Sequence, residues 1–173
     1  MKYLKIAADL GDVESIFKYG SYMFSGKDEI PPNQEIGLKY LKMAADNGHA
    51  IAMNNYGFCM ENGIGTPVDI DEACRYYKLA IEKGSIDAMY SYGYMLLVGE
   101  LIPRNTDDGV KYIMKAAEQG HDFSLYYCGQ IYEKGISVEV DKEKAIQYYK
   151  LAAAKGVDRA NNAILRLLEE TKE

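Results

Sequence analysis

The chain has 173 residues, with 20 Lys or Arg against 26 Asp or Glu, so its formal net charge at pH 7 is −6. Nucleic-acid binding requires clustered positive charge, and this acidic composition therefore argues against a DNA or RNA partner. Hydrophobic residues make up 48% of the chain, which is typical of a folded protein, and no apolar run approaches the ~20 residues that a membrane-inserted helix needs.

One nine-residue segment recurs along the chain. It runs from Tyr3 to Gly11, and its copies begin at Tyr40, Tyr76, Tyr112 and Tyr148, which are 37, 36, 36 and 36 residues apart. Two further glycines follow each of the first four copies at fixed distances, at Gly20, Gly57, Gly93 and Gly129 and at Gly26, Gly63, Gly99 and Gly135. The chain is therefore a tandem array of short repeats.

Each repeat is predicted to form two antiparallel helices. The first helix begins just after the glycine that closes the nine-residue segment. The second begins at an Asn or Asp that can cap free backbone N–H groups, and it ends at a glycine that tolerates left-handed backbone. The capping residues are Asn33, Asp69, Asn105 and Asp141, and the terminal glycines are Gly48, Gly84, Gly120 and Gly156.

Glycines inside the first helix need their own explanation, because glycine in a helix interior costs about 1 kcal/mol relative to alanine. Gly20, Gly57, Gly93 and Gly129 share one register. We expect close approach of the second helix of the same repeat to require them. Approach by a ligand is the alternative.

These residues resemble the Sel-one-like repeat family, whose units are relatives of tetratricopeptide repeats. In the first helix of a repeat, the resemblance rests on a glycine that follows a large residue and on a later glycine, as in Tyr56-Gly57 and Gly63. In the second helix it rests on an aspartate, an alanine four residues later and an alanine pair before the closing glycine, as in Asp141, Ala145, Ala152-Ala153 and Gly156. Gly37 and Gly109 depart from the pattern, since they replace the alanine kept at Ala73 and Ala145. The resemblance implies an all-α, right-handed α-solenoid of antiparallel helix-turn-helix repeats that serves as an adaptor in protein complexes.

The array divides into an unpaired second helix at 1–11, repeats at 12–48, 49–84, 85–120 and 121–156, and a capping helix at 157–173. The unpaired first segment suggests a piece of a longer array, or a molecule that associates with itself through that face. In the last segment Leu165 replaces the internal glycine, and the charged residues 169–173 suit an outer cap.

Positions on the first helices that vary between repeats are expected to face a partner. By analogy with tetratricopeptide repeats they line the concave surface, and they are rich in aromatic residues, as recognition surfaces are. The predicted partner-binding residues are Phe17, Phe24, Asn54, Asn55, Phe58, Tyr90, Tyr94, Phe123, Tyr126, Tyr127 and Gln130. For any one of them, the alternative is burial between adjacent helices.

No pattern predicts catalysis, a cofactor or a metal site. His49 and His121 lie two repeats apart, and a hydrolase would need a titratable cluster that the sequence does not provide. Cys59, Cys74 and Cys128 are too scattered for a zinc motif. Cys59 and Cys74 could form a disulfide, but reduced thiols in the cytoplasm are the expectation.

The sequence thus favours a non-enzymatic scaffold that binds a protein or peptide through an aromatic groove. Two alternatives stay open. One is a carbohydrate-binding module, because tyrosine rings also stack on sugars. The other is a regulatory repeat segment of a larger enzyme or signalling protein.

Overall fold

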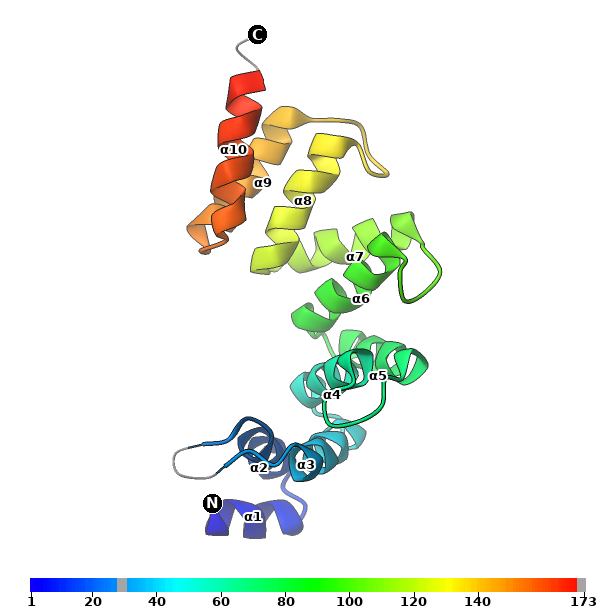
Figure 1. Ribbon diagram of the computed structural model, residues 1–173, viewed down its shortest axis with the longest axis vertical. Helices are drawn as coiled ribbons and strands as arrows, with labels where there is room; N and C mark the ends of the chain where they lie inside the picture. Colours follow the sequence, from blue (N-terminus) through cyan, green and yellow to red (C-terminus); the bar gives the residue numbers. More distant parts are fainter. Residues whose placement is uncertain (28–30, 171–173) are drawn as a thin grey trace. The chain divides into compact units, whose positions relative to one another are not determined.

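The computed structural model describes residues 1–27 and 31–170, which form ten α-helices joined by short connections (Figure 1). The helices are α1 (Lys2–Asp9), α2 (Val13–Ser25), α3 (Gln34–Asp46), α4 (Ala50–Asn62), α5 (Ile70–Glu82), α6 (Ile86–Val98), α7 (Thr106–Glu118), α8 (Asp122–Lys134), α9 (Lys142–Ala154) and α10 (Asp158–Glu170). The last three residues of the predicted charged tail lie outside the described residues.

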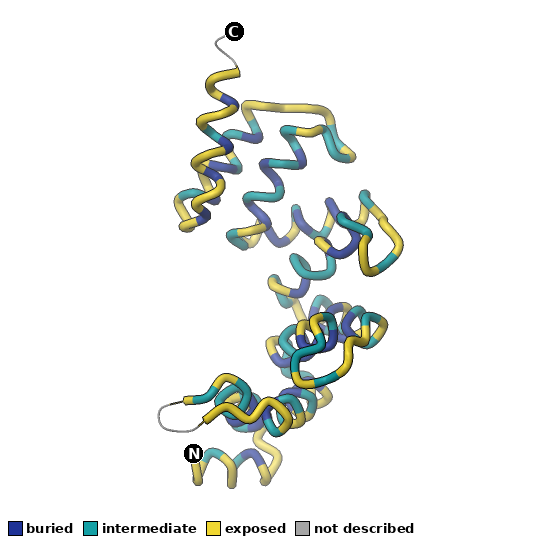
Figure 2. Tube along the Cα trace, viewed as in Figure 1, coloured by how far each residue is buried: buried dark blue, intermediate teal, exposed yellow. Residues whose placement is uncertain are grey.

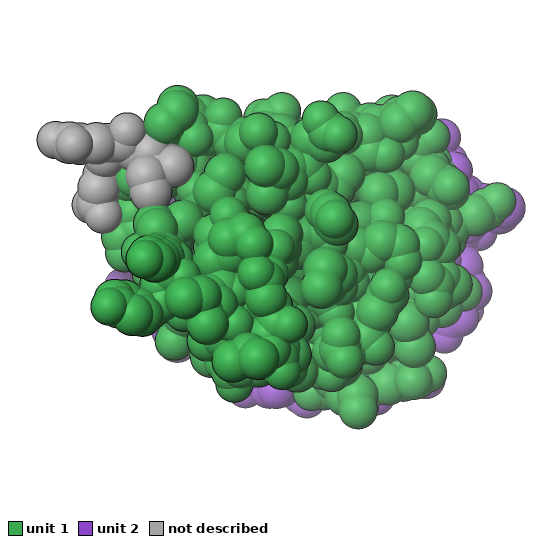
Figure 3. Space-filling model, turned by 90° about the horizontal axis from the view of Figure 1, so that it is seen from below, with its two compact units in different colours: residues 1–88 green, residues 89–173 purple. Residues whose placement is uncertain are grey.

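The chain divides into two compact units, residues 1–88 and residues 89–173, which Figure 3 distinguishes by colour. Within each unit, helices that follow one another in the chain pack together: α1 to α5 in unit 1, and α7 to α10 in unit 2. Each helix buries one face and exposes the other, as the alternating colours along the trace in Figure 2 show.

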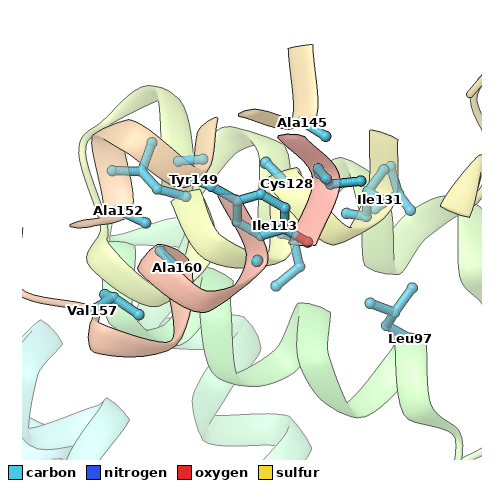
Figure 4. Close-up of a cluster of buried hydrophobic side chains, with 14 residues drawn as sticks. Leu97, Ile113, Cys128, Ile131, Ala145, Tyr149, Ala152, Val157 and Ala160 are labelled. Atoms are coloured by element: carbon cyan, nitrogen blue, oxygen red, sulfur yellow. The ribbon is translucent and has the colours of Figure 1, made fainter. Parts of the chain in front are cut away.

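Small residues and tyrosines fill the interior of unit 1. Ala44, Ala45 and Ala52 are fully buried, and so are the rings of Tyr76 and Tyr77. In unit 2 the buried cluster draws side chains from α6 to α10 (Figure 4). Ile113, Cys128, Ile131, Tyr149 and Leu167 are among the most buried residues of this cluster.

The predicted caps of the second helices are confirmed. Asn33, Asp69, Asn105 and Asp141 each accept a hydrogen bond from the backbone N–H three residues further on. The terminal glycines follow these helices with positive φ, for example +89° at Gly48. Such a backbone is nearly cost-free for glycine and strained for other residues.

Close approach of the second helix explains the internal glycines, as predicted. A Cβ atom at Gly129 would lie 2.5 Å from ring atoms of Tyr149, and one at Gly20 would lie 2.9 Å from the backbone nitrogen of Leu41. Both neighbours belong to the second helix of the same repeat. Any side chain at these positions would push the helix pair apart.

Two kinds of repeat alternate along the chain. In the second and fourth repeats, a tyrosine ring of the second helix lies on the internal glycine, and its hydroxyl donates to a glutamate on the first helix. These pairs are Tyr77 with Glu61 and Tyr149 with Glu133, at 2.6 Å each.

The first and third repeats place Leu41 and Ile113 where the other two repeats have tyrosine. Their second helices carry an additional glycine, and a Cβ atom at Gly37 would lie only 2.5 Å from the backbone of Phe24. Gly37 and Gly109 are therefore more than neutral replacements for alanine, because they bring the end of the first helix against the second.

A ladder of tyrosine–aspartate bonds joins successive second helices in unit 1. Tyr40 donates to Asp9 at 2.9 Å, and Tyr76 donates to Asp46 at 2.5 Å. Lys42 approaches both members of the second pair, with its Nζ 2.8 Å from Asp46 and 3.1 Å from the Tyr76 hydroxyl. The first residue of the nine-residue segment thus helps to join one repeat to the next.

Candidate functional site

Five of the predicted partner-binding residues form one aromatic cluster in unit 2. The cluster consists of Tyr90 and Tyr94 on α6 and Phe123, Tyr126 and Tyr127 on α8. The Tyr90 ring centroid lies 6.0 Å from that of Phe123 and 6.0 Å from that of Tyr127. The Tyr127 centroid lies 5.2 Å from that of Tyr94 and 5.7 Å from that of Tyr126. Helical spacing of three or four residues places the rings of each helix on one face.

The cluster combines exposed and half-buried rings. Phe123 is 46% exposed and Tyr94 is 37% exposed, whereas Tyr90, Tyr126 and Tyr127 are half-buried. Burial raises the pKa of Tyr127 well above its ordinary value, with the neighbouring Tyr90 and Tyr94 adding to the rise. The Tyr127 hydroxyl therefore stays protonated at neutral pH.

His121 supports the cluster from the start of α8. Its Nδ1 accepts a hydrogen bond from the backbone N–H of Ser124 at 3.1 Å and so caps the helix. Its imidazole stacks on Tyr90 with the centroids 4.7 Å apart. The capping bond fixes the imidazole, and the imidazole in turn supports the tyrosine ring.

Gln130 lies beside the cluster, where its Nε2 donates to the Tyr126 hydroxyl at 3.3 Å. The ring of Tyr126 also contacts Tyr149, a core residue, with the centroids 5.5 Å apart. Tyr126 therefore connects the exposed rings to the interior of unit 2.

Three predicted residues of unit 1 line a cavity of about 220 Å³ between α2, α3 and α4. They are Phe24, Asn55 and Phe58, and Phe58 is 50% exposed. The remaining lining residues are all uncharged: Ser21, Ser25, Leu41 and Cys59. A neutral, partly apolar hollow of this size can hold one side chain of a ligand.

The other two predicted residues of unit 1 lie outside that lining. Phe17 stacks on His49 with the centroids 4.2 Å apart, and the His49 Nε2 lies 3.3 Å from a carboxylate oxygen of Glu14. The Oδ1 atom of Asn54 is buried and has no hydrogen-bond partner within residues 1–27 and 31–170. The structure therefore does not group Phe17 and Asn54 with the cavity.

The two histidines have a structural role that the sequence analysis missed. Both cap a first helix, His49 by accepting from the N–H of Ala52 at 3.2 Å and His121 as described above. Their position in the sequence could have indicated this role. Each histidine directly follows a closing glycine, and Asp12 and Ser85, which cap α2 and α6, occupy the same position in their repeats.

The thiols are free and sheltered. Cys59, Cys74 and Cys128 form no disulfide, and burial raises the pKa of Cys59 to about 11 and that of Cys128 to about 12. In the part of the chain that the structure describes, no three His, Cys, Asp or Glu side chains meet as a metal site would require. None of the ten helices there is long and apolar enough to cross a bilayer.

Comparisons with known proteins agree with this architecture. The family model of the Sel1 repeat matches residues 1–12, 13–49, 50–85, 86–121 and 123–157. No curated protein matches the chain.

Several solved structures are similar to the chain. A protective antigen of uropathogenic Escherichia coli strains with an SLR fold is 29% identical, with a TM-score of 0.85 over 92% of this chain and 34% of that one. A Sel1 repeat protein from Oxalobacter formigenes is 26% identical, with a TM-score of 0.82 over 90% of this chain and 63% of that one.

Helicobacter pylori cysteine rich protein B shares the fold alone, at 15% identity and a TM-score of 0.60 over 75% of this chain and 96% of that one. The chain spans about a third of the E. coli antigen and 63% of the Oxalobacter protein. The prediction of an all-α solenoid built from helix-turn-helix repeats is confirmed, and the chain belongs to the Sel1 repeat family.

Proposed function

We propose that this chain is a non-enzymatic interaction scaffold that binds a peptide or a partner helix through the aromatic cluster of unit 2. Sel1 repeats are generally protein-interaction modules. The observation that carries the proposal is the contiguous set of five rings on α6 and α8, two of them at least a third exposed. Tyrosine is among the residue types on which binding energy concentrates in protein interfaces.

Peptides selected from a random displayed library test the proposal. Their affinity for the intact chain is measured by fluorescence anisotropy, beside a Tyr94→Ala, Phe123→Ala double variant that removes the two exposed rings. We expect affinity to fall by at least roughly tenfold, as for the loss of interface anchor residues. Leu151→Ala is the control, because Leu151 is 53% exposed and lies on α9, outside the aromatic cluster.

Two outcomes contradict the proposal. One is unchanged peptide affinity in the double variant while helicity and melting stay intact. The other is failure of the library to yield any binder while an oligosaccharide panel binds in a Tyr94-dependent way. The second result would favour the carbohydrate-binding alternative, since stacked tyrosine rings also suit the faces of sugars.

Self-association through α1 is a separate proposal. Tyr3 and Ile6 of α1 are 84% and 46% exposed, and Leu10, which directly follows the helix, is 83% exposed, so this end of unit 1 presents apolar side chains to solvent. Such faces commonly mark contact surfaces. Sedimentation velocity over a range of concentrations should show association that a Tyr3→Ser, Leu10→Ser variant abolishes; concentration-independent sedimentation of the unaltered chain would contradict this proposal.

A further inference from the structure

Two glutamates hold the same place in the two units. Glu61 lies thirteen residues after Gly48, and Glu133 lies thirteen residues after Gly120. Each carboxylate accepts a hydrogen bond of 2.6 Å from a tyrosine on the second helix of its repeat, Tyr77 or Tyr149. In both cases this bond occupies one carboxylate oxygen, Oε2, and leaves Oε1 for another donor.

Unit 2 shows which group binds to such a glutamate. The Arg166 guanidinium on α10 donates to Oε1 of Glu133 at 2.7 Å, and its other terminal nitrogen donates to Glu170 at 3.1 Å. The Glu133 side chain is only 12% exposed. A charge-assisted bond of this kind is stronger than a neutral one, and the planar guanidinium matches carboxylate geometry.

Glu61 has the tyrosine but lacks the arginine. Among the described residues, the hydroxyl of Tyr77 is its one hydrogen-bond partner, and no cationic side chain forms an ion pair with it. Its carboxylate is half-buried and is oriented by Tyr77 as Glu133 is by Tyr149. A cation supplied from outside the chain would therefore meet an acceptor that is already oriented.

The cavity of unit 1 lies on the same helix. Phe58 and Glu61 are three residues apart on α4, so their side chains are neighbours on the helix surface. Asn55 and Phe58 line the cavity of about 220 Å³. An apolar cavity of roughly 150 Å³ already admits a benzene ring, so a single leucine or phenylalanine side chain fits this one.

We infer that this face of α4 binds a partner segment in which an arginine lies next to an apolar residue. The arginine pairs with Oε1 of Glu61 as Arg166 pairs with Glu133, and the apolar side chain enters the cavity beside Phe58. The inference rests on the proposed interaction function and adds the chemistry of the partner. It concerns unit 1, so it is tested separately from the aromatic cluster.

The probe is the capped dipeptide acetyl-Leu-Arg-amide, titrated into the isotopically labelled intact chain and followed by NMR. We expect saturable shifts of the Asn55 side-chain amide and of backbone amides around Glu61. The matched probe replaces arginine with citrulline, which keeps the shape and removes the charge. It should bind about twofold to fivefold more weakly, the range expected for a partly exposed ion pair.

Variants locate the charge effect. Glu61→Gln keeps an oxygen for the Tyr77 hydroxyl but removes the charge, and it should abolish the preference for arginine over citrulline. Glu35→Gln is the control, because Glu35 is exposed in the first turn of α3, away from the cavity lining. Arg166→Gln should create a second arginine-preferring site by freeing Glu133.

Equal affinity for the two dipeptides, or the same preference in Glu61→Gln, would overturn the inference. So would the absence of any saturable shift up to the solubility limit of the arginine dipeptide. Failure of Arg166→Gln to create an arginine-preferring site at Glu133 would also contradict the inference, because the inference is built on the comparison of Glu61 with Glu133. If selected peptides still bind through Tyr94 and Phe123 in these cases, the proposed function stands while the arginine site falls.

Discussion

Replacement of Gly129 by alanine tests whether the internal glycines exist for close helix packing. The new Cβ atom would lie 2.5 Å from Cδ1 and from Cε1 of the Tyr149 ring and 2.8 Å from Cζ. Tyr149 is only 1% exposed, and its hydroxyl bonds to Glu133 at 2.6 Å. The ring therefore cannot move away without straining the core or stretching that bond.

The free-energy terms have opposite signs. Alanine gains about 1 kcal/mol over glycine in a helix interior. Overpacking of a well-filled core costs about 1–3 kcal/mol, and a weakened hydrogen bond to a charged group costs about 1.5–3 kcal/mol more. We expect Gly129→Ala to lower the free energy of unfolding by about 1.5–5 kcal/mol, the sum of these terms.

Gly57→Ala is the matched comparison. Its Cβ atom would lie 3.0 Å from the Tyr77 ring, so a shift of a few tenths of an ångström relieves the contact. The helix gain then offsets most of the cost, and we expect a change close to zero.

Urea unfolding followed by far-UV circular dichroism measures both variants, and native-state hydrogen exchange of α8 and α9 localises the loss. If Gly129→Ala stabilises the chain by about 1 kcal/mol, as alanine does at an exposed helical site, the packing explanation is wrong.

Three further predictions concern single side chains. Burial tends to raise the pKa of Asp46, but hydrogen bonds from Lys42 and Tyr76 outweigh it and hold the pKa below its ordinary value. This contribution to stability is present above the pKa of the unfolded state and is lost as the pH falls through the lower folded value, so Asp46→Asn should flatten the acid limb of a plot of stability against pH. Cys59, whose pKa burial raises to about 11, should react with a thiol reagent at mildly alkaline pH only as urea unfolds the chain; rapid labelling of the native chain would contradict its burial. Asn54→Leu removes a buried carbonyl oxygen that has no partner among the described residues and should raise the free energy of unfolding by about 1 kcal/mol, so a destabilised variant would show that this oxygen is satisfied.

The helices and their ends could be predicted because the chemistry that fixes them is local. An Asn or Asp accepts the backbone N–H three residues ahead, as Asp141 does from Lys144 at 2.8 Å, and a glycine such as Gly156 takes φ of +90° after the helix. Both signals involve residues adjacent in the sequence, so one copy suffices to read them. The repeat period then predicts the positions of all the remaining helices.

The functional surfaces were only partly predictable, because ring stacking and cavities depend on contacts between repeats. Periodicity places Tyr90 and Phe123 on the faces of their helices, but it does not show that His121 stacks on Tyr90. It also grouped Phe17 with Phe24, although only Phe24 lines the cavity of unit 1. The distance between two first helices is set by the volumes of the side chains between them, which a single helix pattern does not contain.

The alternation of repeat types was visible in the sequence but required comparison of two positions at once. The position thirteen residues after the closing glycine reads Phe24, Glu61, Leu97 and Glu133, while the facing position on the second helix reads Leu41, Tyr77, Ile113 and Tyr149. A carboxylate occurs wherever the facing residue has a hydroxyl to donate, and an apolar side chain occurs wherever it has none.

This pairing has a physical reason that also limits which changes the array tolerates. A half-buried carboxylate without its tyrosine would lose a hydrogen bond to a charged group, and a buried tyrosine hydroxyl without its carboxylate would be left unsatisfied. The two positions must therefore change together. The first repeat, which has an apolar residue in place of the glutamate, also needs glycine at Gly37, because the backbone of Phe24 leaves no room there for a Cβ atom. Three coupled positions thus define each repeat type, and only the type with a glutamate has a carboxylate at this position.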